Sequence, residues 1–162
     1  MGTRSMICRE NADGSVDAIY CHLYGYPENN GRILLQHYTD PAKVYALIAL
    51  GSLSSLGEEI GNKHKFDDEY GNRCTAHHRD RGDPMNIIHV DELIEIINLN
   101  NKKIWGDIQF WYVFRKGAWF VTGGEWFSLI QLTPSMCGIK DPAQCPPVRA
   151  VASTGEIARC SP

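Results

Sequence analysis

A short charged stretch in the middle of the chain has the composition of a ligand-binding site. The segment AHHRDRGD, residues 76–83, combines two histidines, two arginines and two aspartates. Imidazole titrates near neutral pH, and a guanidinium group presents five N–H donors in a planar fork that suits phosphate. In an extended segment Arg79 and Arg81 point the same way, which predicts a site for a phosphate or another anion. The candidate anion ligands are Arg73, His77, His78, Arg79 and Arg81.

Other interpretations of this stretch stay open. Its arginines can form exposed ion pairs with neighbouring carboxylates, which are common and contribute little to stability. Cys74 and His77 have a C-x-x-H spacing that can bind zinc if two further ligands arrive, for which His64 and Cys21 are candidates. His77 or His78 could also act as the general base of a metal-dependent hydrolase or nuclease, or of a nucleotide-processing enzyme.

A second candidate region is YCHLYGYP, residues 20–27. If Tyr20, His22 and Tyr24 share one face of a strand, they form a polar aromatic stripe that can stack a base. The alternative is that the stripe packs against a helix. We include His22, Tyr24 and Tyr26 among the candidate ligand-binding residues.

The common catalytic signatures are missing from the sequence. It contains no GxxxxGK[ST] phosphate loop, no GxGxxG motif, no GxSxG nucleophile turn, no HExxH motif and no deaminase HxE with PCxxC. These absences remove most common enzyme classes. We therefore favour a binding protein over an enzyme, and predict no catalytic residue, no cofactor and no bound metal.

Composition and charge indicate a soluble globular protein. The chain has 162 residues, of which 43% are hydrophobic and 22% charged, enough to bury one core. A net charge of −3 disfavours unselective binding to nucleic acid or to an anionic membrane. No secretory signal and no run of about 18 apolar residues is present, which predicts a cytoplasmic protein. The cysteines, scattered without a CxxC pair, are then expected to be reduced thiols.

The first half of the chain predicts a hairpin followed by helices. Asp13 and Gly14 form a turn signal between two β-prone runs, because glycine accepts a positive φ. The segments RILLQHY and DPAKVYALIALG have helical apolar spacing, with Asp40 as N-cap and Pro41 as the first helical residue. The residues of the second helix expected in the core are Val44, Leu47 and Ile48.

The second half predicts loops, a helix and an aromatic hairpin. Residues 52–84 read as loops with short strands within 64–69 and 72–80. VDELIEIINL predicts an amphipathic helix with Val90, Leu93, Ile94 and Ile97 on one face. DIQFWYVFRKGAWFVTGG predicts two strands joined at RKG, and EWFSLIQL a last strand or a short helix.

These elements predict an α+β domain over residues 1–132, followed by a flexible Pro/Ala/Ser-rich tail over 133–162. Its small antiparallel sheet combines the N-terminal hairpin with the aromatic C-terminal hairpin, and two or three helices pack on one face. Aromatic hairpins can also pair edge to edge, so a homodimer is compatible with the sequence.

The motifs YCHLYGYP, LLQHYTDPAKVYALIALGSLSSLG, HRDRGD and WYVFRKGAWFV together resemble a family of small uncharacterised proteins that tailed bacteriophages and prophages encode. The resemblance covers roughly residues 2–132. The chain departs from the family pattern at Leu23 and Tyr24, where the family has Trp and Asp. The resemblance implies an accessory protein of the host cytoplasm that acts by binding.

Two binding hypotheses follow from the resemblance. In the first, the protein counters host defence by sequestering a nucleotide-like ligand, with Arg79, Arg81 and His78 on the phosphate and Tyr24 or Tyr26 on the base. In the second, exposed tyrosine and tryptophan side chains anchor the protein on a host defence protein and block it.

Overall fold

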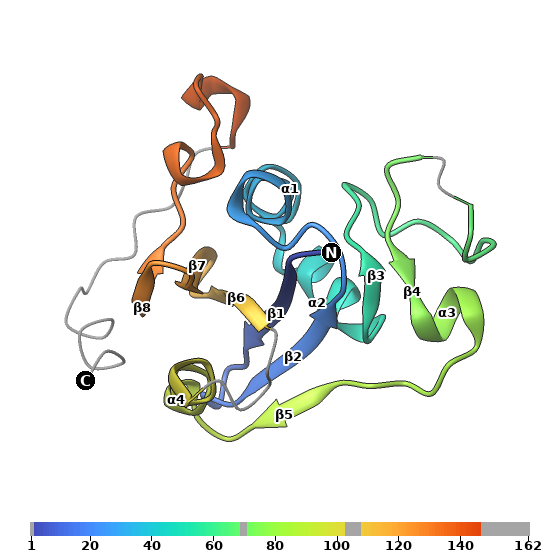
Figure 1. The fold of residues 1–162 in the computed structure, drawn as a ribbon, viewed down its shortest axis with the longest axis horizontal. Helices are drawn as coiled ribbons and strands as arrows, with labels where there is room; N and C mark the ends of the chain where they lie inside the picture. The colour runs from blue at the N-terminus through green and yellow to red at the C-terminus, as the bar shows by residue number, and fades with distance from the viewer. Residues whose placement is uncertain (1, 69–70, 103–107, 147–162) are drawn as a thin grey trace.

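A mixed β-sheet runs through the computed structural model, which describes residues 2–68, 71–102 and 108–146 (Figure 1). The sheet has eight strands in the order β4-β3-β2-β1-β6-β7-β8, and β5 pairs with β2. β1–β6 and β2–β3 are parallel pairs, and the other pairs are antiparallel. The strands are β1 (Arg4–Glu10), β2 (Val16–Cys21), β3 (Leu53–Ser55), β4 (Thr75–Ala76), β5 (Ile88–Val90), β6 (Ile108–Arg115), β7 (Ala118–Gly123) and β8 (Trp126–Gln131).

Local turn chemistry forms both predicted hairpins. Between β1 and β2, the carboxylate of Asp13 accepts a hydrogen bond from the backbone N–H of Ser15 at 3.0 Å, and Gly14 has a φ of +90°. Between β6 and β7, Lys116 and Gly117 both have positive φ, 52° and 78°, as a two-residue type I′ turn requires. The prediction of these two hairpins is confirmed.

Helices cover both faces of the sheet. α1 (Arg32–His37) and α2 (Pro41–Ala49) pack on one face, and α4 (Leu93–Lys102) packs on the other (Figure 1). Successive residues of β1 alternate between the two cores: Ile7 lies in the α1/α2 core, and Met6 and Cys8 lie in the α4 core. The predicted α+β class is confirmed. The sheet is nevertheless mixed rather than antiparallel, and helices on one face only were a wrong prediction, because the central strands are apolar on both faces.

The second helix begins as predicted. The side chain of Asp40 accepts a hydrogen bond from the N–H of Ala42 at 2.9 Å, and Pro41 is the first helical residue. The three residues predicted for the core, Val44, Leu47 and Ile48, are buried.

The middle of the chain differs from the prediction in two elements. Residues His77–Arg81 form a short helix, α3, directly after β4, where the sequence suggested a strand. Val90 belongs to β5 and pairs with Val16, so the fourth helix starts only at Leu93. The residues 64–68 form no strand. EWFSLIQL, for which the sequence predicts either a strand or a short helix, forms β8.

The packed part of the chain continues beyond residue 132. Two short 3-10 helices, Ser135–Cys137 and Pro142–Gln144, follow β8. Cys137 and Ile139 are buried in the α1/α2 core, and the side chain of Gln36 donates a hydrogen bond to the carbonyl of Gln144 at 3.2 Å. Residues 133–146 are therefore part of the domain, while the rest of the predicted tail lies outside the described residues. Among the helices that the structure describes, none is long and apolar enough to span a membrane.

Candidate functional site

The two candidate motifs flank the short strand β3. Leu53 in the short strand β3 pairs with Cys21 of β2 on one side and with Ala76 of β4 on the other. His22 and His77 follow these two partners in the chain, so they lie on either side of β3. The charge of His22 is close enough to lower the pKa of His77. The fold thus places His22 and His77 on the two sides of β3. Because β2 and β4 run in opposite directions beside β3, the segments that follow them leave β3 toward opposite ends.

Asp80 is the buried centre of the AHHRDRGD segment. Its side chain is 0% exposed, and it accepts hydrogen bonds from the backbone N–H groups of Ala76 at 2.8 Å and His64 at 3.1 Å. Arg79 donates from Nε at 2.9 Å and from Nη2 at 3.1 Å. Burial tends to raise the pKa of Asp80, but the hydrogen bonds from Arg79, Ala76 and His64 outweigh it and lower the pKa. Asp80 is therefore a structural carboxylate.

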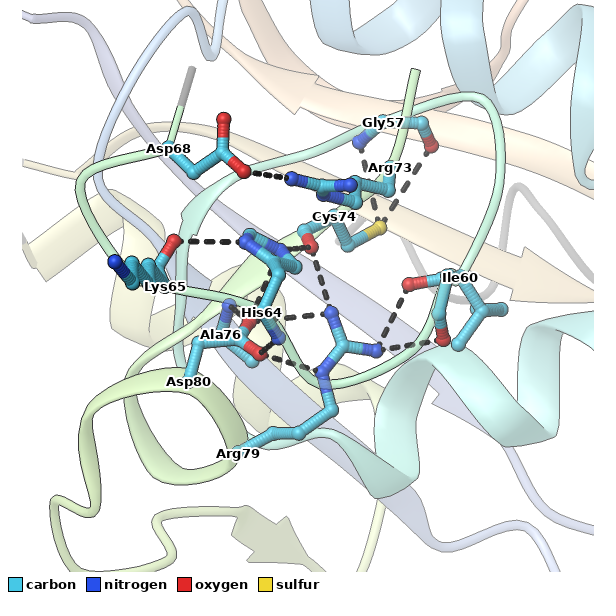
Figure 2. Close-up of polar contacts among 11 residues, drawn as sticks. Gly57, Ile60, His64, Lys65, Asp68, Arg73, Cys74, Ala76, Arg79 and Asp80 are labelled. Carbon is cyan, nitrogen blue, oxygen red and sulfur yellow. Dashed lines mark hydrogen bonds and ion pairs between the residues drawn. The ribbon is translucent and has the colours of Figure 1, made fainter. Parts of the chain in front are cut away.

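Arg79 uses all its donors inside the protein (Figure 2). Besides Asp80, it donates to the carbonyls of Ile60 and Gly61, both at 2.9 Å, and of Cys74 at 2.7 Å. A guanidinium group has five N–H groups, and these five bonds occupy them all. No donor of Arg79 is left for phosphate. Arg79 instead links α3 to residues 57–68 and 71–74. We call these residues the 57–74 loop.

Arg81 points elsewhere, because residues two apart on a helix do not face the same side. The sequence places Arg79 and Arg81 on one side only if the segment is extended, and this condition is not met, because residues His77–Arg81 are helical. Arg81 pairs with Asp83 at 2.6 Å, and its guanidinium lies 4.4 Å from the ring centroid of Phe66. The hydrogen bond from Arg81 is the main cause that lowers the pKa of Asp83. Arg81 keeps an exposed side chain on a fixed aromatic support.

The surroundings of His77 disfavour its charged form. Burial, followed by the charges of Arg81 and His22, lowers the pKa of His77. Its Nδ1 lies 3.0 Å from Nη2 of Arg81, and its ring packs on Phe66 with centroids 5.3 Å apart. Since guanidinium can only donate, Nδ1 acts as acceptor and is already occupied. His78 is exposed, and its Nδ1 lies 2.7 Å from the backbone carbonyl of Asp83.

The other candidate ligands are also engaged. Arg73 pairs with Asp68 at 2.6 Å. The thiol of Cys74 is buried beside the Tyr38 hydroxyl at 3.4 Å, and burial raises its pKa. Within the described ranges, no three His, Cys, Asp or Glu side chains gather as metal ligands. The zinc hypothesis for Cys74 and His77 therefore finds no ligand set in this part of the chain.

The YCHLYGYP segment forms a fixed turn at the end of β2. The hydroxyl of Tyr20 lies 2.7 Å from Nδ1 of His22 and accepts a hydrogen bond from Nε of Arg4 at 3.0 Å. Tyr24 is not on this stripe: the strand ends at Cys21, and Tyr24 has a left-handed φ of +57°. A tyrosine rarely adopts this conformation, which costs about 1–2 kcal/mol. The side chains of Tyr24 and Tyr26 are exposed.

Asn30 holds this turn from inside. It is fully buried, and its Nδ2 donates to the Ser5 hydroxyl at 3.2 Å and to the Leu23 carbonyl at 3.4 Å. Its backbone N–H bonds to the Tyr24 carbonyl at 3.2 Å. Asn30 lies in a π-helical turn, Pro27–Gly31, a rare element that is frequent at functional sites.

These contacts define a surface that we call the polar aromatic surface. The name covers the hydrogen-bonded and stacked residues on both sides of β3 and the two exposed tyrosines of the turn that follows β2. Its members are Arg4, Tyr20, His22, Tyr24, Tyr26, Phe66, His77 and Arg81.

The sequence alone missed several residues of this region. Phe66 had no distinguishing pattern, since it lies in a loop far from its partners in the chain. Asn30 was also missed, and His64 was considered only as a zinc ligand. The repeated Asn in PENNG, next to Pro27, was the one local hint of a structured turn.

Comparison of the chain with protein-family models, with curated proteins and with solved structures found no match.

Proposed function

We propose that the protein is a non-enzymatic binding protein that blocks a host protein, with the polar aromatic surface as its contact face. The observation that carries this proposal is the Tyr24 turn. The turn keeps a tyrosine in a left-handed conformation at 52% exposure, supported by the buried Asn30. Exposed tyrosines that are already fixed lose little entropy on binding, which makes them efficient anchors in protein interfaces.

Polar side chains of the candidate site already have hydrogen-bond partners within the protein, which supports a binding role over catalysis. Nδ1 of His77 accepts from Arg81, and the donors of Arg79 are all used. The Cys74 thiol is buried, and its pKa is raised, so it is a poor nucleophile. A hydrolase, nuclease or nucleotide-processing enzyme based on His77 or His78 is for this reason the weaker proposal.

The resemblance to small phage and prophage proteins supports a host defence protein as the target and the host cytoplasm as the place of action. Arg81 fits this role, because arginine and tyrosine carry much of the energy of protein interfaces. Its stacking on Phe66 and its ion pair with Asp83 fix the guanidinium before a partner arrives.

A nucleotide-like ligand is the second candidate, favoured by the position of Arg81 beside His77 and by the exposed side chains of Tyr24 and Tyr26. In this case Arg81 would exchange the Asp83 carboxylate for a phosphate, and Tyr24 or Tyr26 would stack on the base. The ion pair that the phosphate replaces is exposed, so the exchange would cost little.

Affinity capture from host extract, followed by titration with the purified captured protein, tests the proposal. We expect wild type and Tyr45→Ala to bind the same stoichiometric partner, since Tyr45 is an exposed tyrosine on α2. Tyr24→Ala and Tyr26→Ala should each raise the dissociation constant about 30-fold or more. Equal binding by all variants would refute the proposed contact face.

Thermal unfolding with added nucleotides distinguishes a nucleotide-like ligand from a protein partner. A ligand at 100 times its dissociation constant should add about 2.7 kcal/mol of stability. Stabilisation that is lost in Arg81→Ala would favour the nucleotide ligand over a protein partner. No change in the melting temperature with any nucleotide would count against it.

A further inference from the structure

The side chain of His64 lies in an unusual hydrogen-bonding environment between the 57–74 loop and Asp80 of α3 (Figure 2). Its Nδ1 lies 2.8 Å from the backbone carbonyl oxygen of Lys65. Its Nε2 lies 3.0 Å from the carbonyl oxygen of Cys74 and 3.4 Å from Oδ2 of Asp80. The side chain is 7% exposed, so water has little access to the ring. Both ring nitrogens therefore face oxygens that accept hydrogen bonds.

A neutral imidazole cannot satisfy both of these contacts. It carries one N–H, so in either tautomer the other nitrogen directs a lone pair at an oxygen. The imidazolium ion donates from both nitrogens, and the nearby Asp80 carboxylate balances its charge. Histidine usually changes its charge between about pH 5 and 8, within the range that a cell or an assay can reach.

The groups around His64 divide into those that favour the second proton and those that oppose it. Asp80 favours it, while the permanently charged Arg79 opposes it and shares both Oδ2 of Asp80 and the Cys74 carbonyl. Lys65 contributes its carbonyl oxygen, and Arg73 is neutralised by Asp68. Protonation of His64 therefore determines whether both of its ring nitrogens can donate to the oxygens that face them.

We propose that His64 is a pH-dependent clasp: its second proton closes the 57–74 loop against α3, and loss of that proton loosens the loop. The clasp controls a residue of the polar aromatic surface. Phe66, two positions after His64, packs on His77 and lies under Arg81. Loosening the loop removes this support, so Phe66 is held best against His77 and Arg81 when His64 carries its second proton. Only this effect on binding rests on the proposed function, because the clasp itself does not require it.

Nuclear magnetic resonance of the full chain tests the clasp directly. We expect ¹⁵N spectra of the His64 ring to show both nitrogens protonated at about pH 5.5 and one at about pH 8. Over the same interval the exchange protection of the His64 and Cys74 amides, corrected for the intrinsic rate, should fall about tenfold, the effect of one charge-assisted hydrogen bond. A ring that stays neutral in one tautomer, with constant protection, would overturn the clasp.

The variant His64→Gln provides a second test. Glutamine donates from one end only and does not titrate, so the protection of the Cys74 amide should no longer depend on pH. His89→Gln, which removes a histidine on β5, should keep the pH dependence of the wild-type loop. Loss of this dependence in both variants, or in neither, would contradict the assignment to His64.

The binding consequence is measured separately, with the captured partner at about pH 5.5 and about pH 8. We expect wild type to bind about tenfold more tightly at the lower pH, and His64→Gln to bind equally at both, if the clasp supports the contact face. If His64 gains its second proton but Tyr24→Ala does not weaken binding, the proposed function is refuted and the clasp is not. If Tyr24→Ala weakens binding but His64 never gains its second proton, the clasp is refuted and the proposed function is not.

Discussion

Asp80 shows how a charged residue in a polar stretch can be structural. It accepts hydrogen bonds from two backbone N–H groups and from Arg79, and its side chain is closed to solvent. A buried carboxylate of this kind costs stability when its charge is removed, because Arg79 is then left buried without its counter-charge. The charge of Asp80 therefore maintains the 57–74 loop rather than a ligand contact.

We expect Asp80→Asn to lower the free energy of unfolding by about 3 kcal/mol, the usual cost of breaking a buried ion pair. Urea unfolding of wild type and variant measures this value. Asp83→Asn removes a carboxylate of the exposed pair with Arg81 and should have a much smaller effect. Equal effects of the two substitutions would contradict a structural role for Asp80.

The difference in stability between wild type and Asp80→Asn depends on pH. The pKa of Asp80 is lowered in the folded protein, so its contribution is present above the ordinary carboxyl pKa of about 4. It is lost as the pH falls through the folded value. Wild type and Asp80→Asn should therefore converge in stability in acid.

At the level of elements, the 57–74 loop depends on a close backbone approach. Gly57 has no Cβ, and a Cβ built at this position would lie 2.2 Å from the carbonyl carbon of Arg73. The hydroxyl of Tyr38 also donates to the Gly57 carbonyl at 2.7 Å, and the thiol of Cys74 accepts from its N–H at 3.3 Å. The two ends of the loop can meet only with glycine here.

We expect Gly57→Ala to destabilise the protein by about 2–3 kcal/mol, because the backbone at Arg73 must move. Thermal or urea unfolding measures the loss. Gly82→Ala is the control: no atom lies within 4 Å of its Cβ position, and its φ of +83° should cost about 1 kcal/mol. A smaller effect at Gly57 than at Gly82 would argue against the close approach.

The short strand β5 is tied to β2 by a titratable pair. Nδ1 of His89 lies 2.6 Å from the carboxylate of Asp17, its cross-strand partner. This hydrogen bond is the main cause that raises the pKa of His89. A histidine whose pKa is raised by folding adds stability below its unfolded pKa, about 6.5, and loses it as the pH rises through the folded value.

We therefore expect His89→Gln to be destabilising at about pH 5.5 and nearly neutral well above the folded pKa. Unfolding free energies at a series of pH values provide the measurement. In the Asp17→Asn background the substitution at His89 should lose this pH dependence. Its persistence there would show that another group raises the pKa.

For the whole molecule, the decisive feature is one sheet with a helical layer on each face. Leu47 of α2 and Ile97 of α4 are both fully buried, in different cores. The strands β1 and β6 contribute to both cores, which links the two layers through the same backbone.

We expect Leu47→Ala and Ile97→Ala each to cost about 2–5 kcal/mol. The two effects should add, because the side chains share no partner across the sheet. Circular dichroism and tryptophan fluorescence should report one transition in wild type, with Trp111 in the α4 core and Trp119 in the α1/α2 core. An Ile97→Ala variant as stable as wild type would contradict the second layer.

Features that depend on a few neighbouring residues can be predicted from the amino-acid sequence. The Asp13–Gly14 turn, the Asp40 cap with Pro41, and the turn at Lys116 and Gly117 follow from local φ preferences and local hydrogen bonds. The apolar spacing of the second helix also identified its buried face correctly.

The roles of the charged residues depend on contacts between residues that are far apart in the chain. Arg79 binds carbonyls of Ile60, Gly61 and Cys74, which lie up to 19 residues away in the chain, and no local pattern encodes these partners. Likewise, Val90 continues a helical apolar pattern, but its strand partner is Val16. A hydrogen bond or a strand pair gains its free energy from groups that the fold brings together, so the same residues have different roles in different surroundings.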